Sequence, residues 1–296
     1  MLINQANIQS LFAGYKTSFQ KAFDGTVSTY DQIAMISPSQ NSEENYVWLS
    51  EFARFREWLG DRVIRNLSAQ NYVVKNRKFE DTVSVSRDKV EDDNYGIFAP
   101  IFSEMGRAAR QHPDELVYAL LATGFAALCY DGQNFFDIDH PVIDANGNEQ
   151  SVSNMQAGAT DPWYLIDSSR MIRPIIWQQR TPYEFQSLDQ GSDQNVFLRD
   201  EFLYGVRARA NAGFGLWQLA FGSKDTLDTT NYEEARQAMM ALKGDHGKPL
   251  GIKPTHLVVP NSLEGAARRL LVNQVKDAGA SNEWAGSAEL IVTPYL

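Results

Sequence analysis

The sequence predicts an α+β protein, in which helices and strands occupy separate stretches of the chain. Side chains alternate between apolar and polar from Phe79 to Arg87, which is the period of a strand that is wet on one side. Apolar residues recur at helical spacing in the stretch after Pro113. Strand-like and helix-like segments follow one another over residues 255–294, as in a small α/β unit. With 296 residues, 43% of them hydrophobic, the chain can bury a sizeable core.

Composition argues against several classes of protein. The formal net charge of −10, with no basic cluster longer than a pair, argues against a nucleic-acid-binding surface. Cys129 is the only cysteine, which excludes an internal disulfide and indicates a reducing compartment. No apolar run reaches about 18 residues and no basic-apolar leader follows Met1, so we expect no membrane span and no signal peptide.

The first segment, residues 1–45, combines a short amphipathic helix with a polar tail. Apolar residues recur at helical spacing between Ile8 and Phe19, and glycine, serine and proline then break the pattern. The helix could pack on its own subunit or dock on a neighbour, and the sequence leaves both alternatives open. An apolar cluster that is expected in the core follows it: Trp48, Leu49, Phe52, Phe55, Trp58 and Leu59.

Residues 56–90 predict an extended, charged double arm, with its turn at Asn76 and Arg77 and with no core of its own. A strand of ten residues reaches about 33 Å. A compact chain of this length has a radius of gyration of only about 19 Å. Such an arm could project well beyond its own body, so we expect it to lie on a neighbouring subunit.

Two helices are expected next, over residues 96–111 and 113–130. Pro113 suits the first position of the second helix, because its missing N–H and fixed φ cost nothing there. Asp114 and Glu115 then place negative charge against the positive end of the helix dipole. One apolar stripe completes this helix, and it consists of Leu116, Val117, Leu120, Leu121 and Leu128.

One stretch invites an enzymatic interpretation, because Asp131, Asp137, Asp139 and His140 lie close together in the sequence. Carboxylates and an imidazole are ligands of hydrolytic metal sites, where the ion lowers the pKa of a bound water. On a strand, however, Asp137 and Asp139 would point to one face and His140 to the other. The chain also lacks an HExxH motif, an EF-hand loop and a GxSxG elbow. A solvated turn and strand edge is therefore the favoured interpretation.

Strands are expected over residues 163–188, followed by a long partner strand that includes Arg207 and Arg209 on one face. Two arginines in this arrangement more often make salt bridges across a sheet or an interface than bind an anion. Gly213 and Gly215 lie in the same strand-like run without completing a GxGxxG motif. They therefore predict a bend or bulge and not a phosphate site.

The last third predicts compact α/β structure. Thr230 and Glu233 form a capping box for a helix that Gly244 ends. A buried strand, a capped helix and a final strand follow over residues 255–294.

Several ordered blocks of the sequence resemble the major head (capsid) subunit of Mu-like phages and prophages. They cover nearly the whole chain, and they are REWLGDRV, KFEDTVSVSRDKVEDDNYG, EMGRAA, HPDELV, CYDGQNFFDIDHPV, YGVRARANAGFGLWQLA, LVVPNSLEGAARRLL and the terminal ELIVTPYL. The resemblance implies the Hong Kong 97-type phage capsid fold. In that fold the double arm is the E-loop, the helix from Pro113 is the spine of the peripheral domain, and the C-terminal α/β unit is the axial domain.

The resemblance also implies a division of the chain and a function. The expected parts are an N-terminal arm (1–55), an E-loop (56–94), a peripheral domain with the spine helix and long strands (95–225) and an axial domain (226–296). The expected function is that of a major capsid protein of a tailed bacteriophage or prophage, a structural protein and not an enzyme. It would self-assemble into the hexamers and pentamers of an icosahedral head that encloses double-stranded DNA. A prophage-derived shell or compartment protein of the same fold and a metal-dependent hydrolase are the alternatives.

We expect no catalytic residue, no metal ligand and no cofactor. The expected partners are other copies of the chain, a scaffold and maturation protease, a portal and a decoration protein, in a virion that is assembled in the host cytoplasm. DNA would be enclosed without sequence-specific binding. The residues expected at contacts between subunits are Tyr72, Lys75, Asn76, Arg77, Lys78, Phe79, Arg207 and Arg209.

Overall fold

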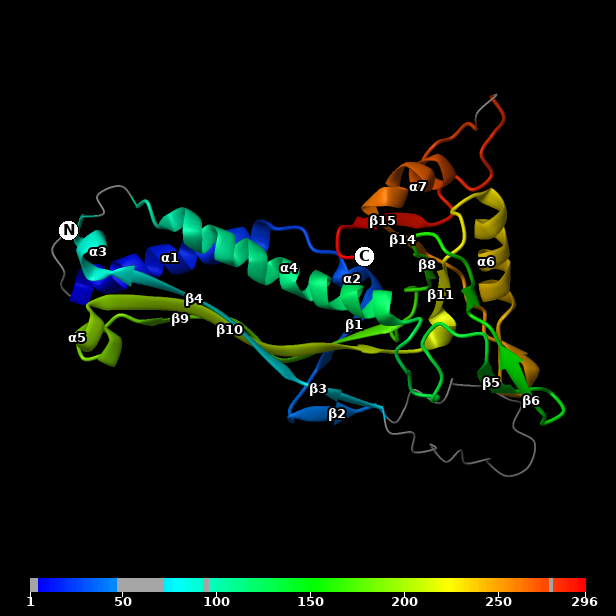
Figure 1. Ribbon diagram of the computed structural model, residues 1–296, viewed down its shortest axis with the longest axis horizontal. Coiled ribbons are helices and arrows are strands. Elements are labelled where there is room, and N and C mark those ends of the chain that lie inside the picture. Colours follow the sequence, from blue (N-terminus) through cyan, green and yellow to red (C-terminus); the bar gives the residue numbers. More distant parts are fainter. Residues whose placement is uncertain (1–4, 47–71, 93–95, 277–278) are drawn as a thin grey trace.

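The computed structural model describes residues 5–46, 72–92, 96–276 and 279–296, and it shows an elongated molecule (Figure 1). At one end, two long helices lie along a four-stranded sheet. A second sheet with its own helices forms the other end. The helices are α1 (Gln5–Gly25), α2 (Tyr30–Ile33), α3 (Arg87–Asp92), α4 (Ala99–Thr123), α5 (Gln194–Arg199), α6 (Thr229–Ala241) and α7 (Glu264–Leu271). None of the helices in these described ranges has the length and apolar composition needed to cross a membrane.

The four-stranded sheet has the order β1–β9–β10–β4. Its strands are β1 (Ala34–Pro38), β4 (Arg77–Ser86), β9 (Ile175–Leu188) and β10 (Glu201–Phe214). Along β10, Phe202, Tyr204 and Val206 are buried, whereas Leu203 is half-buried and Arg207 is exposed. This alternation shows that one face of the sheet is covered, and the cover consists of α1 and α4 (Figure 1).

Helix α1 packs on its own subunit. Of the two alternatives that the sequence left open, own-subunit packing or docking on a neighbour, the structure therefore shows the first. The Tyr15 ring stacks on Phe102 of α4 with centroids 4.2 Å apart, and Phe19 stacks on Phe185 of β9 at 5.3 Å. The backbones of α1 and α4 also meet closely at Gly106, where an added Cβ would lie 2.2 Å from the Phe19 carbonyl oxygen. The amphipathic stripe predicted from the sequence therefore joins the core.

The two helices predicted over residues 96–111 and 113–130 are in fact one helix, α4, and Pro113 lies inside it. The prediction that Pro113 begins a helix was wrong. An interior proline removes one backbone hydrogen bond and costs about 3 kcal/mol. Here the burial of Val117 and Leu121 on the same helix offsets that cost. The helix also ends at Thr123, so Leu128, which was expected on its apolar stripe, is 64% exposed.

Asp114 does not act at the start of a helix of its own but supports the start of α2. Its Oδ1 accepts hydrogen bonds from the Ser28 hydroxyl (2.9 Å), Thr29 N (3.0 Å) and Tyr30 N (2.7 Å). Burial raises the pKa of Asp114, and these three hydrogen bonds oppose that shift. The carboxyl therefore fixes the segment between α1 and β1 to the middle of α4.

The double arm is built differently from the prediction. Asn76 does separate two strands, but β3 (Val73–Lys75) pairs with β2 (Glu43–Asn45), and β4 pairs with β10 over its full length. The predicted turn at Asn76 and Arg77, and the absence of a core, are therefore wrong for residues 73–86. Alternation shows that a strand has one wet face, but it does not show which strand it pairs with. Residues 56–71 and the Trp48–Leu59 cluster lie outside the described residues.

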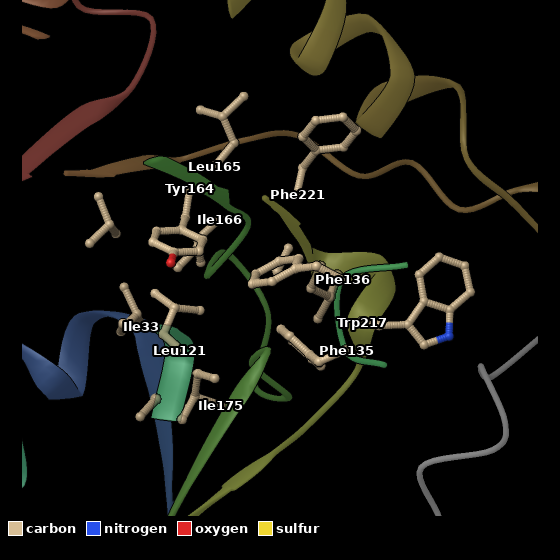
Figure 2. Close-up of a cluster of buried hydrophobic side chains, with 14 of the residues drawn as sticks. Ile33, Leu121, Phe135, Phe136, Tyr164, Leu165, Ile166, Ile175, Trp217 and Phe221 are labelled. Carbon is tan, nitrogen blue, oxygen red and sulfur yellow. The ribbon is translucent and has the colours of Figure 1, made fainter. Parts of the chain in front are cut away.

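The second sheet has the order β15–β14–β8–β11–β7. Its strands are β7 (Met155–Gln156), β8 (Trp163–Ile166), β11 (Ala220–Ser223), β14 (His256–Pro260) and β15 (Glu289–Thr293). Figure 2 shows Tyr164 and Leu165 of β8 in the buried cluster, together with Phe136 and Leu121. The predicted strand, helix and strand at the C-terminus are confirmed as β14, α7 and β15. β8 and β11, which precede residue 226, belong to the same sheet.

Short elements complete the chain. They are β5 (His140–Ile143), β6 (Glu149–Val152), β12 (Lys243–Gly244), β13 (Lys248–Pro249) and the 3-10 helices η2 (Trp217–Leu219), η3 (Asp245–Gly247) and η4 (Asn261–Leu263). The predicted capping box of α6 was wrong, because Asp228 is the N-cap and accepts from Asn231 N at 2.9 Å. The Asp228 carboxylate, two residues before Thr230, supplies the hydrogen-bond acceptor that the first N–H groups of the helix require.

The two glycines after β10's arginines serve close packing. An added Cβ would lie 2.4 Å from a Val74 methyl at Gly213 and 2.3 Å from the Arg173 carbonyl oxygen at Gly215. The irregularity of the β9–β10 register lies instead between Arg207 and Ala210. The predicted bend or bulge is thus displaced toward the arginines.

Candidate functional site

The residues expected at subunit contacts gather on the four-stranded sheet and at its junction with the β2–β3 pair. Six of them lie within residues 72–79, and the other two lie on β10. In the antiparallel β4–β10 register, Arg209 lies opposite Lys78 and Arg207 lies opposite Glu80. The structure therefore brings two distant parts of the sequence side by side.

The three uncharged members, Tyr72, Asn76 and Phe79, contact their own chain. The Tyr72 hydroxyl accepts a hydrogen bond from Phe214 N at 2.7 Å, and burial, opposed by this bond, raises the pKa of Tyr72 to about 12. Asn76 donates from Nδ2 to two oxygen atoms of the segment between β1 and β2, at 2.8 and 2.9 Å. The Phe79 ring lies 4.3 Å from that of His112 on α4. These contacts anchor the β3–β4 junction to the body, and a role between subunits stays a prediction.

The cationic members are mostly exposed. Lys75 Nζ lies 3.8 Å from a Glu43 carboxylate oxygen, and the Arg77 guanidinium lies 5.1 Å from the Phe79 ring centroid. Within the described part of the chain, Lys78, Arg207 and Arg209 form no ion pair. The expected salt bridges are therefore not made across this sheet. Arg209 faces Lys78 and Thr181, neither of which is acidic, and at the exposed Arg207 an ion pair would contribute little. The alternative, an interface, stays a prediction.

The candidate metal residues separate into two groups, and Asp131 and His140 form the first. His140 is fully buried. Its Nδ1 lies 2.7 Å from Asp131 Oδ2, and its Nε2 lies 3.2 Å from Asn154 Oδ1. The ring stacks on Trp217 with centroids 3.8 Å apart. Asn154 Nδ2 donates to three backbone carbonyls, which turns its Oδ1 toward the imidazole.

Asp131 uses its second oxygen as well. The Cys129 thiol donates to Oδ1 at 3.0 Å, as does Gln133 N at 3.1 Å. Burial acts to raise the pKa of Asp131, but the hydrogen bonds from His140 and Cys129 outweigh it and hold that pKa below its usual range. Burial and the Asp131 carboxylate raise the pKa of the Cys129 thiol. A thiol that resists ionisation is a poor metal ligand.

Asp137 and Asp139, the second group, do not join this cluster. Asp137 accepts from Asn134 N and Nδ2 at 3.2 and 2.9 Å, and Asp139 accepts from the Ser151 hydroxyl. The only set of three or more ligand atoms within 4.8 Å of one another, in the ranges described, is that of Cys129, Asp131 and His140. Their donors and acceptors already satisfy one another, so the arrangement clamps the loop before β5 to η2. Sequence reasoning missed Cys129 and Asn154. Cys129 could have been found, since it is a typical metal ligand two residues before Asp131, whereas Asn154 lies 14 residues after His140 and carries no such signal.

A second polar contact was missed by sequence reasoning. The Ser168 hydroxyl lies 3.0 Å from His256 Nδ1, and the His256 Nε2 lies 3.5 Å from a Glu289 carboxylate oxygen. The Thr255 hydroxyl lies 2.8 Å from the same Nδ1, so the two hydroxyls share one nitrogen. Burial lowers the pKa of His256. No sequence signal could have found this contact, since its members come from three strands or strand ends.

Comparison with known proteins accounts for the fold. Residues 8–296 match the family described as Mu-like prophage major head subunit gpT. The chain is 42% identical to the major capsid protein of Escherichia phage Mu, over the full length of both proteins. It is 38% identical to the Mu-like prophage FluMu major head subunit of Haemophilus influenzae, over 98% of this chain and 97% of that protein.

Solved structures give the same result. A chain of the bacteriophage JBD30 procapsid is 44% identical with a TM-score of 0.88, over 99% of this chain and all of that chain. A chain of the JBD30 capsid is 35% identical with a TM-score of 0.77, over 100% of this chain and 99% of that chain. These similarities confirm the predicted α+β capsid fold and favour a structural protein over an enzyme. The chain therefore belongs to the Mu-like prophage major head subunit gpT family.

Proposed function

We propose that this chain, a major capsid protein of a tailed phage, builds the hexamers and pentamers of an icosahedral head. The observation that carries the proposal is the full-length similarity to a procapsid subunit, with a TM-score of 0.88. The shape agrees with this role, because an elongated sheet with helices on one face offers a broad, flat surface for a wall (Figure 1). Packing between copies, and not a reaction, is the mechanism.

The arm that ties neighbours together is the stretch from Tyr46 to Tyr72, in place of the E-loop expected over residues 56–94. Its support is the β2–β3 pair, in which Asn45 lies opposite Val73. The described residues that flank this stretch are neighbours, since Tyr46 N donates to the Tyr72 carbonyl oxygen at 3.0 Å. Segments that add to a neighbouring surface gain main-chain hydrogen bonds there.

The other parts of the expected division are proposed as follows. The peripheral domain comprises α1, α3 and α4 with the four-stranded sheet, and α4 is its spine. The axial domain comprises the five-stranded sheet with α6 and α7, whose tips meet around the five-fold and six-fold axes. Because β8 and β11 pair within that sheet, the axial domain is not one continuous stretch of sequence after residue 225.

The proposed partners are a scaffold and maturation protease, a portal and a decoration protein. A JBD30 capsid that is decorated with minor capsid protein trimers contains a chain 35% identical to this one, with a TM-score of 0.74 over 90% of both, which supports the last of these. The protein would assemble in the host cytoplasm and remain in the virion. The net charge of −10 suits a wall that encloses double-stranded DNA without binding its sequence.

Sedimentation of the chain expressed with its genomic neighbours, followed by negative-stain electron microscopy of the heavy fractions, tests the proposal. Closed shells are the expected result. A subunit that stays monomeric in all conditions would refute it. The arm is tested by replacing residues 47–71 with a short Gly-Ser linker. A variant that melts like the natural subunit but forms no shells is expected, and shells at normal yield would refute the role of the arm.

A further inference from the structure

Two cations face each other on the open side of the four-stranded sheet. Arg209 on β10 lies directly opposite Lys78 on β4. Their chain neighbours Ala208 and Phe79 point to the covered face, where Ala208 is buried and Phe79 meets His112 of α4. Since side chains alternate along a strand, Lys78 and Arg209 lie on the face away from α1 and α4.

The side chains that lie side by side across the sheet at Arg209 do not have complementary charges. Like charges directly opposite each other in an antiparallel pair destabilise it. On its other side Arg209 faces Thr181 of β9, which carries no charge. The next row along the same strands differs, because there Arg207 lies between Glu80 and Glu184.

Arg209 also has an unsatisfied donor. Its Nε is buried and has no hydrogen-bond partner. Over the residues with a described placement, neither Arg209 nor Lys78 has a carboxylate within 4 Å. A buried donor without an acceptor costs free energy. The chain has 37 acidic against 27 basic residues, yet none of the acids among its described residues lies here, so an anion from outside would satisfy both cations.

We propose that Lys78 and Arg209 bind a carboxylate of a neighbouring copy of this chain in the shell. This inference rests on the proposed function and names the chemistry of one contact between subunits. The arginine fork suits two carboxylate oxygens, and the lysine adds a point charge beside it. A second copy is the occupant because a shell surrounds each subunit with copies that carry an excess of acids. The same excess disfavours a DNA phosphate, since a chain of net charge −10 repels a polyanion.

The substitution Lys78→Glu distinguishes this role from a purely structural one. It places a carboxylate opposite Arg209, so it removes the repulsion and supplies the missing acceptor inside the subunit. The unassembled subunit should melt at a higher temperature, while the subunit concentration needed for half-maximal assembly rises about ten-fold or more. Arg209→Gln should weaken assembly similarly without that gain in melting temperature. Arg207→Gln is the matched control, and it should change assembly by about two-fold or less.

Assembly would be followed by light scattering and sedimentation of nuclease-treated protein over a range of NaCl concentrations. The proposal is supported if the Lys78→Glu substitution raises the melting temperature of the subunit and weakens its assembly. A Lys78→Glu variant that assembles at the natural subunit concentration overturns it. If shells of that variant made without nuclease also retain less DNA than natural shells, the ligand is a phosphate. If the natural chain forms no shells, the proposed function itself fails, and the inference fails with it. The inference alone fails if the natural chain forms shells and the Lys78→Glu and Arg209→Gln variants assemble at the same subunit concentration as it does.

Discussion

Replacement of Gly106 with alanine should force α1 away from α4. The added Cβ would lie 2.2 Å from the carbonyl oxygen of Phe19 and 3.0 Å from its carbonyl carbon. Even in favourable contacts a carbon and a carbonyl oxygen stay about 3.3 Å apart. Both atoms that clash belong to helical backbone, which cannot rotate away as a side chain can. The two helices must therefore separate by roughly 1 Å at this point.

Two effects of opposite sign determine the result. Alanine is preferred to glycine in a helix interior by about 1 kcal/mol. Overpacking of a well-packed core costs about 3 kcal/mol when it requires a backbone shift. The shift would also disturb the stacking of Tyr15 on Phe102, whose centroids are 4.2 Å apart. We expect a net loss of about 2 kcal/mol, or a fall of about 3 °C in melting temperature for a chain of this size.

Thermal and urea unfolding of the unassembled subunit, followed by circular dichroism, would measure the effect. Gly14→Ala is the matched control, because Gly14 lies in the interior of α1 with nothing within 4 Å of an added Cβ. That variant should gain about 0.5–1 kcal/mol. A Gly106→Ala subunit as stable as the natural one would show that α1 does not approach α4 as described.

Three further outcomes are expected from unfolding measurements. Asp114→Ala should lose about 1–3 kcal/mol, because two backbone N–H groups at the start of α2 lose their acceptor, and Asp114→Asn should recover most of it. Asp131→Asn should destabilise the subunit at neutral pH. Because the folded pKa of Asp131 is depressed, its contribution is complete above the ordinary carboxyl pKa of about 3.9 and is lost as the pH falls through the folded value. A difference between the two proteins that stays constant as the pH falls below about 3.9 and through the folded value would contradict the depressed pKa of Asp131. Asp228→Ala should cost about 1 kcal/mol and Thr230→Ala clearly less, whereas equal losses would restore the predicted capping box.

Several features followed from local pattern alone. The apolar spacing from Ile8 to Phe19 predicted α1, and the alternation after Phe79 predicted β4. The order of strand, helix and strand near the C-terminus was also predicted correctly. These features depend on the period of side chains along one segment, which a sequence displays directly. The ordered blocks of sequence identified the family, since they extend over nearly the whole chain.

The candidate site was predicted only in part. The residues of 72–79 and the two arginines of β10 were named from the sequence, but the register that sets Arg209 against Lys78 was not. Likewise Asp131 and His140 were named together, whereas Asp137 and Asp139 proved to bind elsewhere. A shift of one residue in strand register, or a different side-chain rotamer, changes which polar atoms meet. The local sequence does not specify either the register or the rotamer.

What the sequence by itself determined is therefore the family and the type of most elements, because both follow from residues near one another in the chain. Only the tertiary structure decided which strand β4 joins, since pairing with β10 depends on contacts between distant segments. It also decided that α4 continues through Pro113, because burial against α1 and the sheet outweighs the lost hydrogen bond. Local helix propensity differs by up to about 1 kcal/mol per residue, or about 3 kcal/mol for proline, and the burial of a long helix face exceeds it.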